Sequence, residues 1–164
     1  MQAQKSSFPD YEEWPVSQSE REELAQSVLG QHLVAVYDSW VDTAKRTLRQ
    51  SYQPKSPTSE QQDYLQWIVN MNDDERHCAL SLIQEITTGM VFSILNVLDN
   101  NRGSILQNKQ CERVRVLLDI MPRDDQGHCV KGKPVETIDL NGEGKGFLYE
   151  RWLDWLEDYS REAE

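Results

Sequence analysis

One apolar segment in the second half of the chain constrains the fold more than any other feature. Asn72 followed three residues later by Glu75 is typical of a capped helix start. The first half of the helix that follows is amphipathic, but residues 90–98 are apolar nearly all round. A helix that is apolar on every side is usually buried in the middle of a domain. The sequence therefore predicts a buried central helix over residues 74–99, ended by an Asn- and Gly-containing segment.

Two further helices precede this segment. Ser19 with Glu22 three positions later indicates a helix start, and the helical spacing continues to about Arg49. Its apolar stripe comprises Ala25, Leu29, Leu33, Val36, Tyr37, Trp40, Ala44 and Leu48. A shorter helix fits residues 60–71, and its shared apolar face comprises Tyr64, Leu65, Ile68 and Met71. Trp67 lies off that face.

The hydrophobic period then changes from that of a helix to that of a strand. Residues 114–121 alternate, with Val114, Val116, Leu118 and Ile120 on one side. A second strand fits within residues 128–138, where Pro134 is expected to face an edge. Two strands alone are marginal in water, so we expect this β-hairpin to pack on the helices.

A last helix follows the Gly-rich run at residues 142–146. Its apolar stripe comprises Leu148, Trp152, Trp155, Leu156 and Tyr159. We expect it to be a lid that seals the core, because large aromatic side chains bury much apolar surface. The alternative is a homodimer in which this helix packs against a second copy.

These elements predict one α+β domain over residues 1–164. It is mostly helical, with the helix at 74–99 in the centre and a two-stranded β-hairpin at one side. Residues 1–16 are expected to form an extended arm, because Phe8 and Trp14 each precede a proline. The aromatic residues of this arm should lie against the domain or against a partner.

The charge of the chain excludes some classes of partner. It holds 28 acidic and 17 basic residues, a net charge of −11. Such an excess argues against binding to nucleic acid and to anionic membranes. Residues 1–23 and 150–164 each hold six acids and two bases, so most of the excess lies in the two ends. These ends either keep the protein soluble or present an acidic surface to a basic partner.

The start of the chain and its cysteines indicate the compartment. No apolar signal region follows Met1, and no apolar run is longer than the five residues 33–37, so no membrane span is expected. Cys78, Cys111 and Cys129 are odd in number and widely spaced, which is typical of reduced thiols rather than a disulfide framework. We therefore expect a cytoplasmic protein.

The candidate metal and anion sites have weak signals. His77–Cys78 and His128–Cys129 are two adjacent pairs, with Cys111 as a further zinc ligand type. Adjacent residues point in different directions, so each pair would offer one ligand, and no metal site is assigned. The Gly-rich run at 142–146 lacks the spacing of a phosphate-binding loop, so we interpret it as a connector.

Carboxylates are the remaining candidates for chemistry. Asp38 and Asp42 share a helix face and are expected to be solvated. Glu85 is expected to meet Arg113, Arg115 or solvent, and Asp99 to cap a helix end. The alternative is a small enzyme or ligand-binding protein. Its pocket would lie between the central helix and the β-hairpin and would be lined by Glu85, Asp99 or His128.

Two segments resemble small bacterial proteins of the immunity type, which belong to polymorphic toxin systems. They are Ile94-Leu95-Asn96-Val97-Leu98-Asp99 and Phe147-Leu148-Tyr149-Glu150-Arg151-Trp152-Leu153-Asp154-Trp155-Leu156. The resemblance spans residues 86–159 and implies a protein that neutralises a partner without catalysis. It carries over no catalytic residue.

We therefore predict a non-catalytic binding protein of the immunity or inhibitor type, acting on a basic protein. No catalytic residue, metal ligand or cofactor is assigned. The expected binding residues are the aromatic anchors Trp14 and Trp67 and the acidic residues Glu150, Asp154, Glu157 and Asp158.

Overall fold

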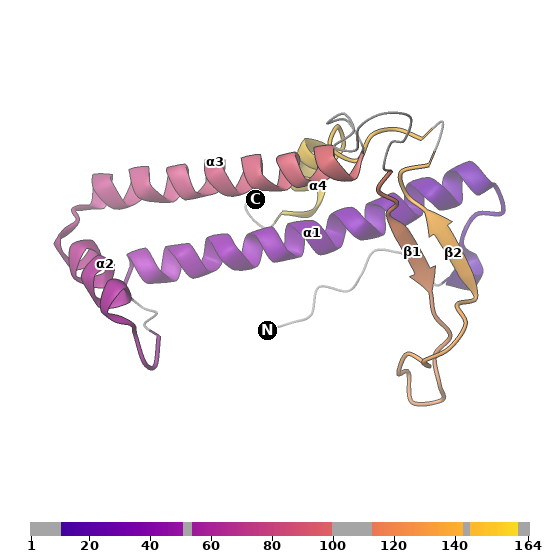
Figure 1. Ribbon diagram of the computed structural model, residues 1–164, viewed down its shortest axis with the longest axis horizontal. Helices are drawn as coiled ribbons and strands as arrows, with labels where there is room; N and C mark the ends of the chain where they lie inside the picture. Colours follow the sequence, from indigo (N-terminus) through magenta and orange to yellow (C-terminus); the bar gives the residue numbers. More distant parts are fainter. Residues whose placement is uncertain (1–10, 51–53, 100–112, 143–144, 161–164) are drawn as a thin grey trace, which may run out of the picture.

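The longest helix, α1 (Gln18–Leu48), is the element on which the rest of the fold packs (Figure 1). The fold comes from a computed structural model that describes residues 11–50, 54–99, 113–142 and 145–160. The other elements are the 3-10 helix Tyr11–Glu13, α2 (Ser59–Asn70), α3 (Asp73–Leu98), β1 (Leu117–Ile120), β2 (Glu136–Asp139) and α4 (Trp152–Tyr159). The predicted mostly helical α+β class is confirmed. Phe8 lies outside the described residues.

Local capping explains where the helices begin. At α3 the Asn72 side chain accepts from the Glu75 N–H at 2.9 Å, and the Asn72 N–H donates to Glu75 Oε2 at 2.8 Å. This confirms the predicted helix start. The same reciprocal pair, Thr58 with Gln61, opens α2 and was not identified in the sequence. Helix α1 is capped by Ser17, so Ser19 lies inside the helix.

The expectation of a buried central helix at residues 74–99 is wrong. Helix α3 runs antiparallel to α1 and contacts it along one side, but Leu95 is its only buried residue. Helix α1 is the central one, since α3, α4 and β2 all contact it. Apolar composition sets what a helix prefers to bury, whereas the number of packed neighbours decides what it does bury. At eight residues, α4 is too short to cover a helix of 26.

The predicted apolar stripe of α1 is rotated in the structure. Val36 and Trp40 are exposed, whereas Gly30 and Asp38 are buried. The full buried set of α1 is Ala25, Gln26, Gly30, Val34, Tyr37, Asp38, Val41 and Leu48. The rotation follows from α4, which packs over Gly30 so closely that a Cβ there would lie 2.6 Å from Trp155 Cε2.

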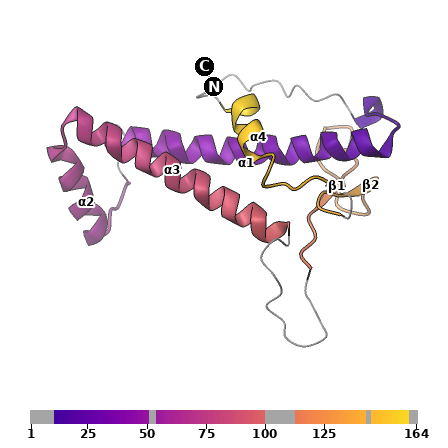
Figure 2. The same cartoon turned by 90° about the horizontal axis from the view of Figure 1, so that it is seen from above.

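The predicted lid is confirmed. Leu148, Trp152 and Trp155 are all buried, and the Trp152 ring meets Tyr37 edge-to-face at 5.8 Å. Because Trp152 and Trp155 lie inside this chain's own core, these two side chains are not available for the dimer contact considered for this helix. Figure 2 shows α4 on one side of α1, with α2 and the end of α3 on the other.

The two strands form an antiparallel pair with Leu117 opposite Asp139 and Ile120 opposite Glu136. Leu118 and Ile120 pack against the core while Leu117 is exposed, which confirms the predicted alternation. The second strand lies later than expected, because residues 128–135 make only an isolated bridge at Cys129.

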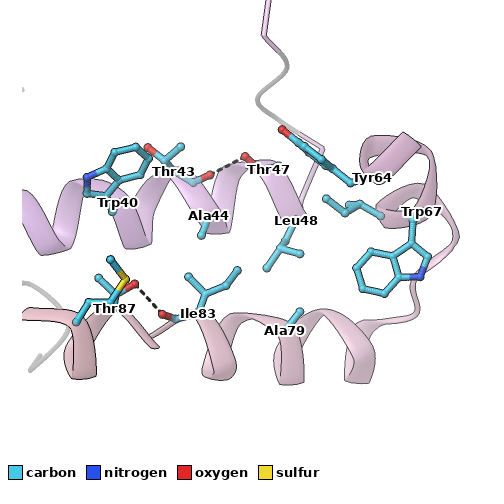
Figure 3. Close-up of a pocket in the computed structure, with 12 residues that line it drawn as sticks. Trp40, Thr43, Ala44, Thr47, Leu48, Tyr64, Trp67, Ala79, Ile83 and Thr87 are labelled. Atoms are coloured by element: carbon cyan, nitrogen blue, oxygen red, sulfur yellow. Dashed lines mark hydrogen bonds between the residues drawn. The ribbon is translucent and has the colours of Figure 1, made fainter. Parts of the chain in front are cut away.

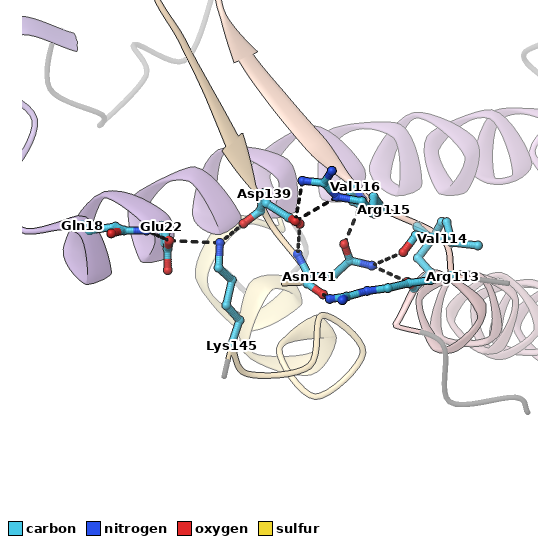
Figure 4. A network of polar contacts seen from close by, with 10 residues as sticks. Gln18, Glu22, Arg113, Val114, Arg115, Val116, Asp139, Asn141 and Lys145 are labelled. Carbon is cyan, nitrogen blue, oxygen red and sulfur yellow. Dashed lines mark hydrogen bonds and ion pairs between the residues drawn. The ribbon is translucent and has the colours of Figure 1, made fainter. Parts of the chain in front are cut away.

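A polar network around Asn141 joins the end of α3 to the sheet (Figure 4). The Asn141 side-chain amide donates to the carbonyl oxygens of Leu98 and Val114, and its oxygen accepts from the Val116 N–H at 2.9 Å. This amide is buried, so all three bonds form away from water. One side chain therefore sets the distance between α3 and the strand.

Candidate functional site

An open apolar groove lies between α1, α2 and α3, on the side of α1 away from α4 (Figures 2 and 3). Its volume is about 530 Å³, within the range of small-molecule and peptide sites. The residues that line it are Trp40, Thr43, Ala44, Thr47, Leu48, Tyr64, Trp67, Ile68, Ala79, Ile83, Thr87 and Met90.

The groove has a fixed floor and an exposed aromatic rim. Leu48 and Ile68 are each only 6% exposed and hold α2 against the α1–α3 pair. At the rim, Trp40 and Trp67 are 66% and 62% exposed. Small side chains such as Ala44 lie between them (Figure 3). The groove therefore exists because small residues face each other where large ones would close the gap.

Three threonines in the wall do not make the groove polar. The hydroxyls of Thr43, Thr47 and Thr87 each donate to a carbonyl oxygen four residues earlier in their own helix, at 2.7–2.9 Å. Their hydroxyl hydrogens are thus used within α1 and α3. The wall offers apolar contact more than hydrogen bonds.

The lining holds no group that is suited to acid–base or nucleophilic chemistry. None of the twelve residues is an acid, a base, a histidine, a cysteine or a serine, and Tyr64 is the single titratable one. General acid–base catalysis needs a positioned group with a pKa near the working pH. What the lining offers is therefore apolar and aromatic contact surface.

Two of the three helices that line the groove, α2 and α3, carry more acidic than basic residues. Within α2 and α3 only Arg76 is basic. The acidic residues of these helices are Glu60, Asp63, Asp73, Asp74, Glu75 and Glu85. Their side of the groove is thus negative, whereas the facing half of α1 carries both signs.

A ridge of exposed apolar side chains continues from the groove along α3. It comprises Leu82, Ile86, Met90, Ile94 and Val97. By length and composition α3 is also able to cross a membrane, and only 6% of its apolar stretch is buried. The expectation that no segment spans a membrane stays a prediction, since α3 qualifies by length and composition alone. It relied on unbroken apolar runs, whereas a helix averages over a longer window.

The expected binding residues divide among three places. Trp67 lies at the groove rim, and its position off the α2 stripe was the sequence signal for it. The expectation that Trp14 is an exposed anchor is wrong, because it is 9% exposed with the Arg21 guanidinium 5.8 Å from its ring centroid. The third place is the surface of α4 and of the short segment before it, where the acids Glu150, Asp154, Glu157 and Asp158 are exposed.

The carboxylate pocket considered between α3 and the β-hairpin does not form from its three residues. Glu85 is exposed on α3, about 21 Å along the helix from Asp99. His128 is exposed in the turn after β1, with its Nδ1 3.6 Å from Asp124 Oδ2. Asp99 caps α3 as expected and accepts from the Tyr149 N–H at 2.9 Å.

Two acids have shifted pKa values for structural reasons. Burial raises the pKa of Asp99, a rise only partly offset by the backbone N–H groups of Tyr149 and Leu148. Burial also raises the pKa of Asp139, but Arg115, the Asn141 N–H and Lys145 together hold it below its ordinary value.

Two expectations about charged pairs need correction. Asp38 is 3% exposed and accepts from Ser160 Oγ at 2.8 Å, so its expected solvation is wrong. Arg115 pairs with Asp139 at 2.9 Å, and Arg113 donates to the Asn141 carbonyl oxygen at 3.2 Å. Of the partners considered for Glu85, solvent is the one it meets.

Metal ligand types are dispersed over the part of the chain that the structure describes. Within those residues no three His, Cys, Asp or Glu side chains form a metal-binding group. Cys78 and Cys129 are exposed free thiols, and Cys111 lies outside the described residues. His77 lines a small cavity with Lys45, Arg49 and Arg76, whose charges repel a cation.

The Gly-rich run does not present its lysine to an anion. Lys145 Nζ lies 3.0 Å from Glu22 Oε1 and donates to the Asp139 carbonyl oxygen (Figure 4). Its charge is therefore already paired, and the run ties the end of β2 to α1. This agrees with its interpretation as a connector.

Comparisons with known proteins assign no family to this chain. No protein-family model matches it, and no curated protein or solved structure shows significant similarity to it.

Proposed function

We propose that this protein is a non-catalytic binding protein of the immunity or inhibitor type, and that the groove between α1, α2 and α3 is its docking surface for a basic protein. The observation that carries the proposal is the composition of the groove. It combines exposed aromatic rims with a lining whose single titratable group is Tyr64.

The rim residues match the side chains that dominate protein interfaces. Trp, Tyr and Met are enriched at interface centres, and a few such anchors carry most of the binding energy. Four such side chains are exposed in this chain and would be buried by a partner: Trp40, Trp67, Tyr64 and Met90. Each sits on a helix, so little ordering of the backbone accompanies binding.

The charges around the groove favour a basic partner. Helices α2 and α3 line the groove and together carry six acids and one arginine, and this negative charge would steer a cationic surface toward them. The acids of α4 lie on the other side of α1 (Figure 2). Salt screens exposed charges beyond roughly 8–10 Å, so the nearer acids should have the greater effect.

The proposal is tested with basic proteins encoded beside this chain in its genome. We expect one of them to co-purify with it and the affinity, measured by titration calorimetry, to fall as salt increases. Trp67→Ala should weaken binding at least about tenfold, as expected of an anchor. The control is Val69→Ala, because Val69 is 49% exposed on the same helix but lies outside the groove.

Two results would contradict the proposal. One is that no basic neighbour binds the full-length protein at low salt. The other is that Trp67→Ala and Val69→Ala weaken binding equally, which would place the docking surface elsewhere.

A further inference from the structure

We propose that the apolar ridge of α3 packs antiparallel against the same ridge of a second copy, forming a homodimer. The five ridge residues, Leu82, Ile86, Met90, Ile94 and Val97, are 46–60% exposed although all are apolar. They recur every three or four positions, so they form one continuous line along the helix. The ridge shares Met90 with the groove, and Trp40 beside it also lines the groove, so a second copy and a bound partner would compete for these two side chains. The proposal does not depend on the proposed function.

The exposed area is sufficient for a stable dimer. The five ridge residues, together with Val36 and Trp40 of α1, expose roughly 70–170 Å² each. Seven such side chains give about 700 Å² per protomer and about 1,400 Å² for a pair, and specific interfaces bury about 1,200–2,000 Å². An exposed apolar patch of this size marks an interaction site.

The ridge is symmetric about its own centre. The four residues from Leu82 to Ile94 are spaced four positions apart around Thr88, so an antiparallel copy places Leu82 beside Ile94 of the partner subunit and Ile86 beside Met90 of the partner subunit. A Cβ at Gly89 would meet nothing within 4 Å in this chain. Glycine weakens a helix interior relative to alanine, and no packing within the chain explains it here. Gly89 lies next to this centre, so its missing side chain leaves room for the second helix.

Charge selects the antiparallel arrangement over the parallel one. Asp73, Asp74 and Glu75 occupy the first turn of α3, whereas no ridge residue is charged. A parallel pair would place the two acidic turns side by side, where like charges repel. In the antiparallel pair they lie at opposite ends, about 39 Å apart along the axis.

The contacts of α3 favour a protein cover over lipid. Leu95 is 1% exposed and packs in the main core with Val91 and Leu98 beside it. Insertion of α3 into a bilayer would remove these residues from the core and break the Asn141 bond to Leu98. A second copy covers the ridge and leaves those contacts in place.

The first experiment measures the mass of the full chain in solution by light scattering after gel filtration. We expect twice the chain mass of 19.1 kDa for the wild type. Ile86→Glu should give the single-chain mass with an unchanged circular dichroism spectrum, because it places a charge inside the interface. Leu153→Glu is the control, since Leu153 is 64% exposed on α4 and lies off the ridge, and it should remain dimeric.

The second experiment tests the orientation by oxidation with copper phenanthroline, with all native cysteines replaced by serine. Met90→Cys lies near the symmetry axis and should form a covalent dimer. Leu82→Cys should not, because in the antiparallel pair the two positions lie about 18 Å apart along the helix.

Several outcomes would overturn the proposal. A monomeric wild type would do so. If the monomer then floats with phosphatidylcholine vesicles, the ridge binds a membrane. If it does not float, a different protein is the partner that covers the ridge. A dimer that survives Ile86→Glu as well as Leu153→Glu would place the interface elsewhere. A crosslink at Leu82→Cys would contradict the antiparallel arrangement.

Discussion

The two ends of the α1–α3 pair are built from the same two helices, but other elements of the chain cover one end more completely than the other. At the closed end, α4 and the β-hairpin cover the pair, and the buried cluster includes Val34, Tyr37, Leu95 and both tryptophans of α4. At the open end only Leu48, Ile68 and Met71 form a buried cluster. There α2 covers one edge and leaves the groove beside it.

The difference lies in where the large side chains of the covering helix point. Trp152 and Trp155 of α4 point inward, and Gly30 of α1 gives one of them room. In α2 the large aromatic residues Tyr64 and Trp67 lie on the rim instead. A covering helix thus closes a core only when its bulky residues lie on its inner face.

The strongest test of this comparison replaces one tryptophan at each end. Trp152→Ala should lower the free energy of unfolding by about 3–5 kcal/mol, because it leaves a cavity in the main core. Trp67→Ala should lower it by less than about 1 kcal/mol, since that ring is exposed. Urea denaturation followed by circular dichroism measures both. Equal losses would show that the open end contributes to the core as much as the closed end does.

The next test concerns the polar contact that fixes α3 at the closed end. Asn141→Asp keeps the acceptor for Val116 but loses the donors to Leu98 and Val114. The Leu98 and Val114 carbonyl groups then lose these bonds and face a carboxylate instead, so we expect a loss of about 2–4 kcal/mol in urea denaturation. The control is Asn96→Asp, whose amide bonds to Phe92 near the surface and should cost far less. Similar losses for the two variants would show that the network does not hold α3 in place.

A smaller effect is expected where α4 meets α1. Gly30→Ala would place a Cβ against the Trp155 ring and should cost about 1–3 kcal/mol of unfolding free energy. In a Trp155→Leu background the added cost should shrink, because the ring that clashes is gone. A double-mutant cycle by thermal denaturation measures this coupling. Additive effects would mean that the two residues do not limit each other's packing.

The smallest effect is a pH dependence at Asp99. Because its folded-state pKa is raised above the ordinary value of 3.8, the folded chain binds a proton there more tightly than the unfolded chain. Its stabilising contribution is complete below pH 3.8 and is lost as the pH rises through the folded-state value. In Asp99→Asn this position does not titrate, so the variant does not lose that contribution. The unfolding free energy of Asp99→Asn minus that of the wild type should therefore rise as the pH increases through this interval. Urea denaturation from pH 3 to 7 measures the difference, and a fall with increasing pH would contradict the sign.

The elements were largely predictable because their signals are local. The capping pair at Asn72 and the alternation around Leu118 depend on neighbours within a few residues. The inner face of α4 was also predictable, since Trp152 and Trp155 share one helical stripe. The second strand was less so, because its short length and the preceding Gly132 and Pro134 weaken the pattern.

The candidate site was only partly predictable, because it depends on which helices meet. Trp67 was identified from its position off the α2 stripe, but its neighbours in the groove come from α1 and α3. Trp14 was expected to be exposed because two prolines limit the local helix, and nothing local shows that the Arg21 side chain covers it. The Gly89 position on α3 carries no sequence signal without the helix around it.

The sequence by itself determined the secondary structure, the acidic character and the apolar nature of α3. Only the tertiary structure decided which apolar faces are covered, since α1 became central and α3 kept an exposed ridge. The physical reason is that hydrophobicity is a property of each residue, whereas burial requires a neighbour of the right shape and length. Helix α4 supplies that neighbour at one end of the pair, and at the other end the chain leaves a groove.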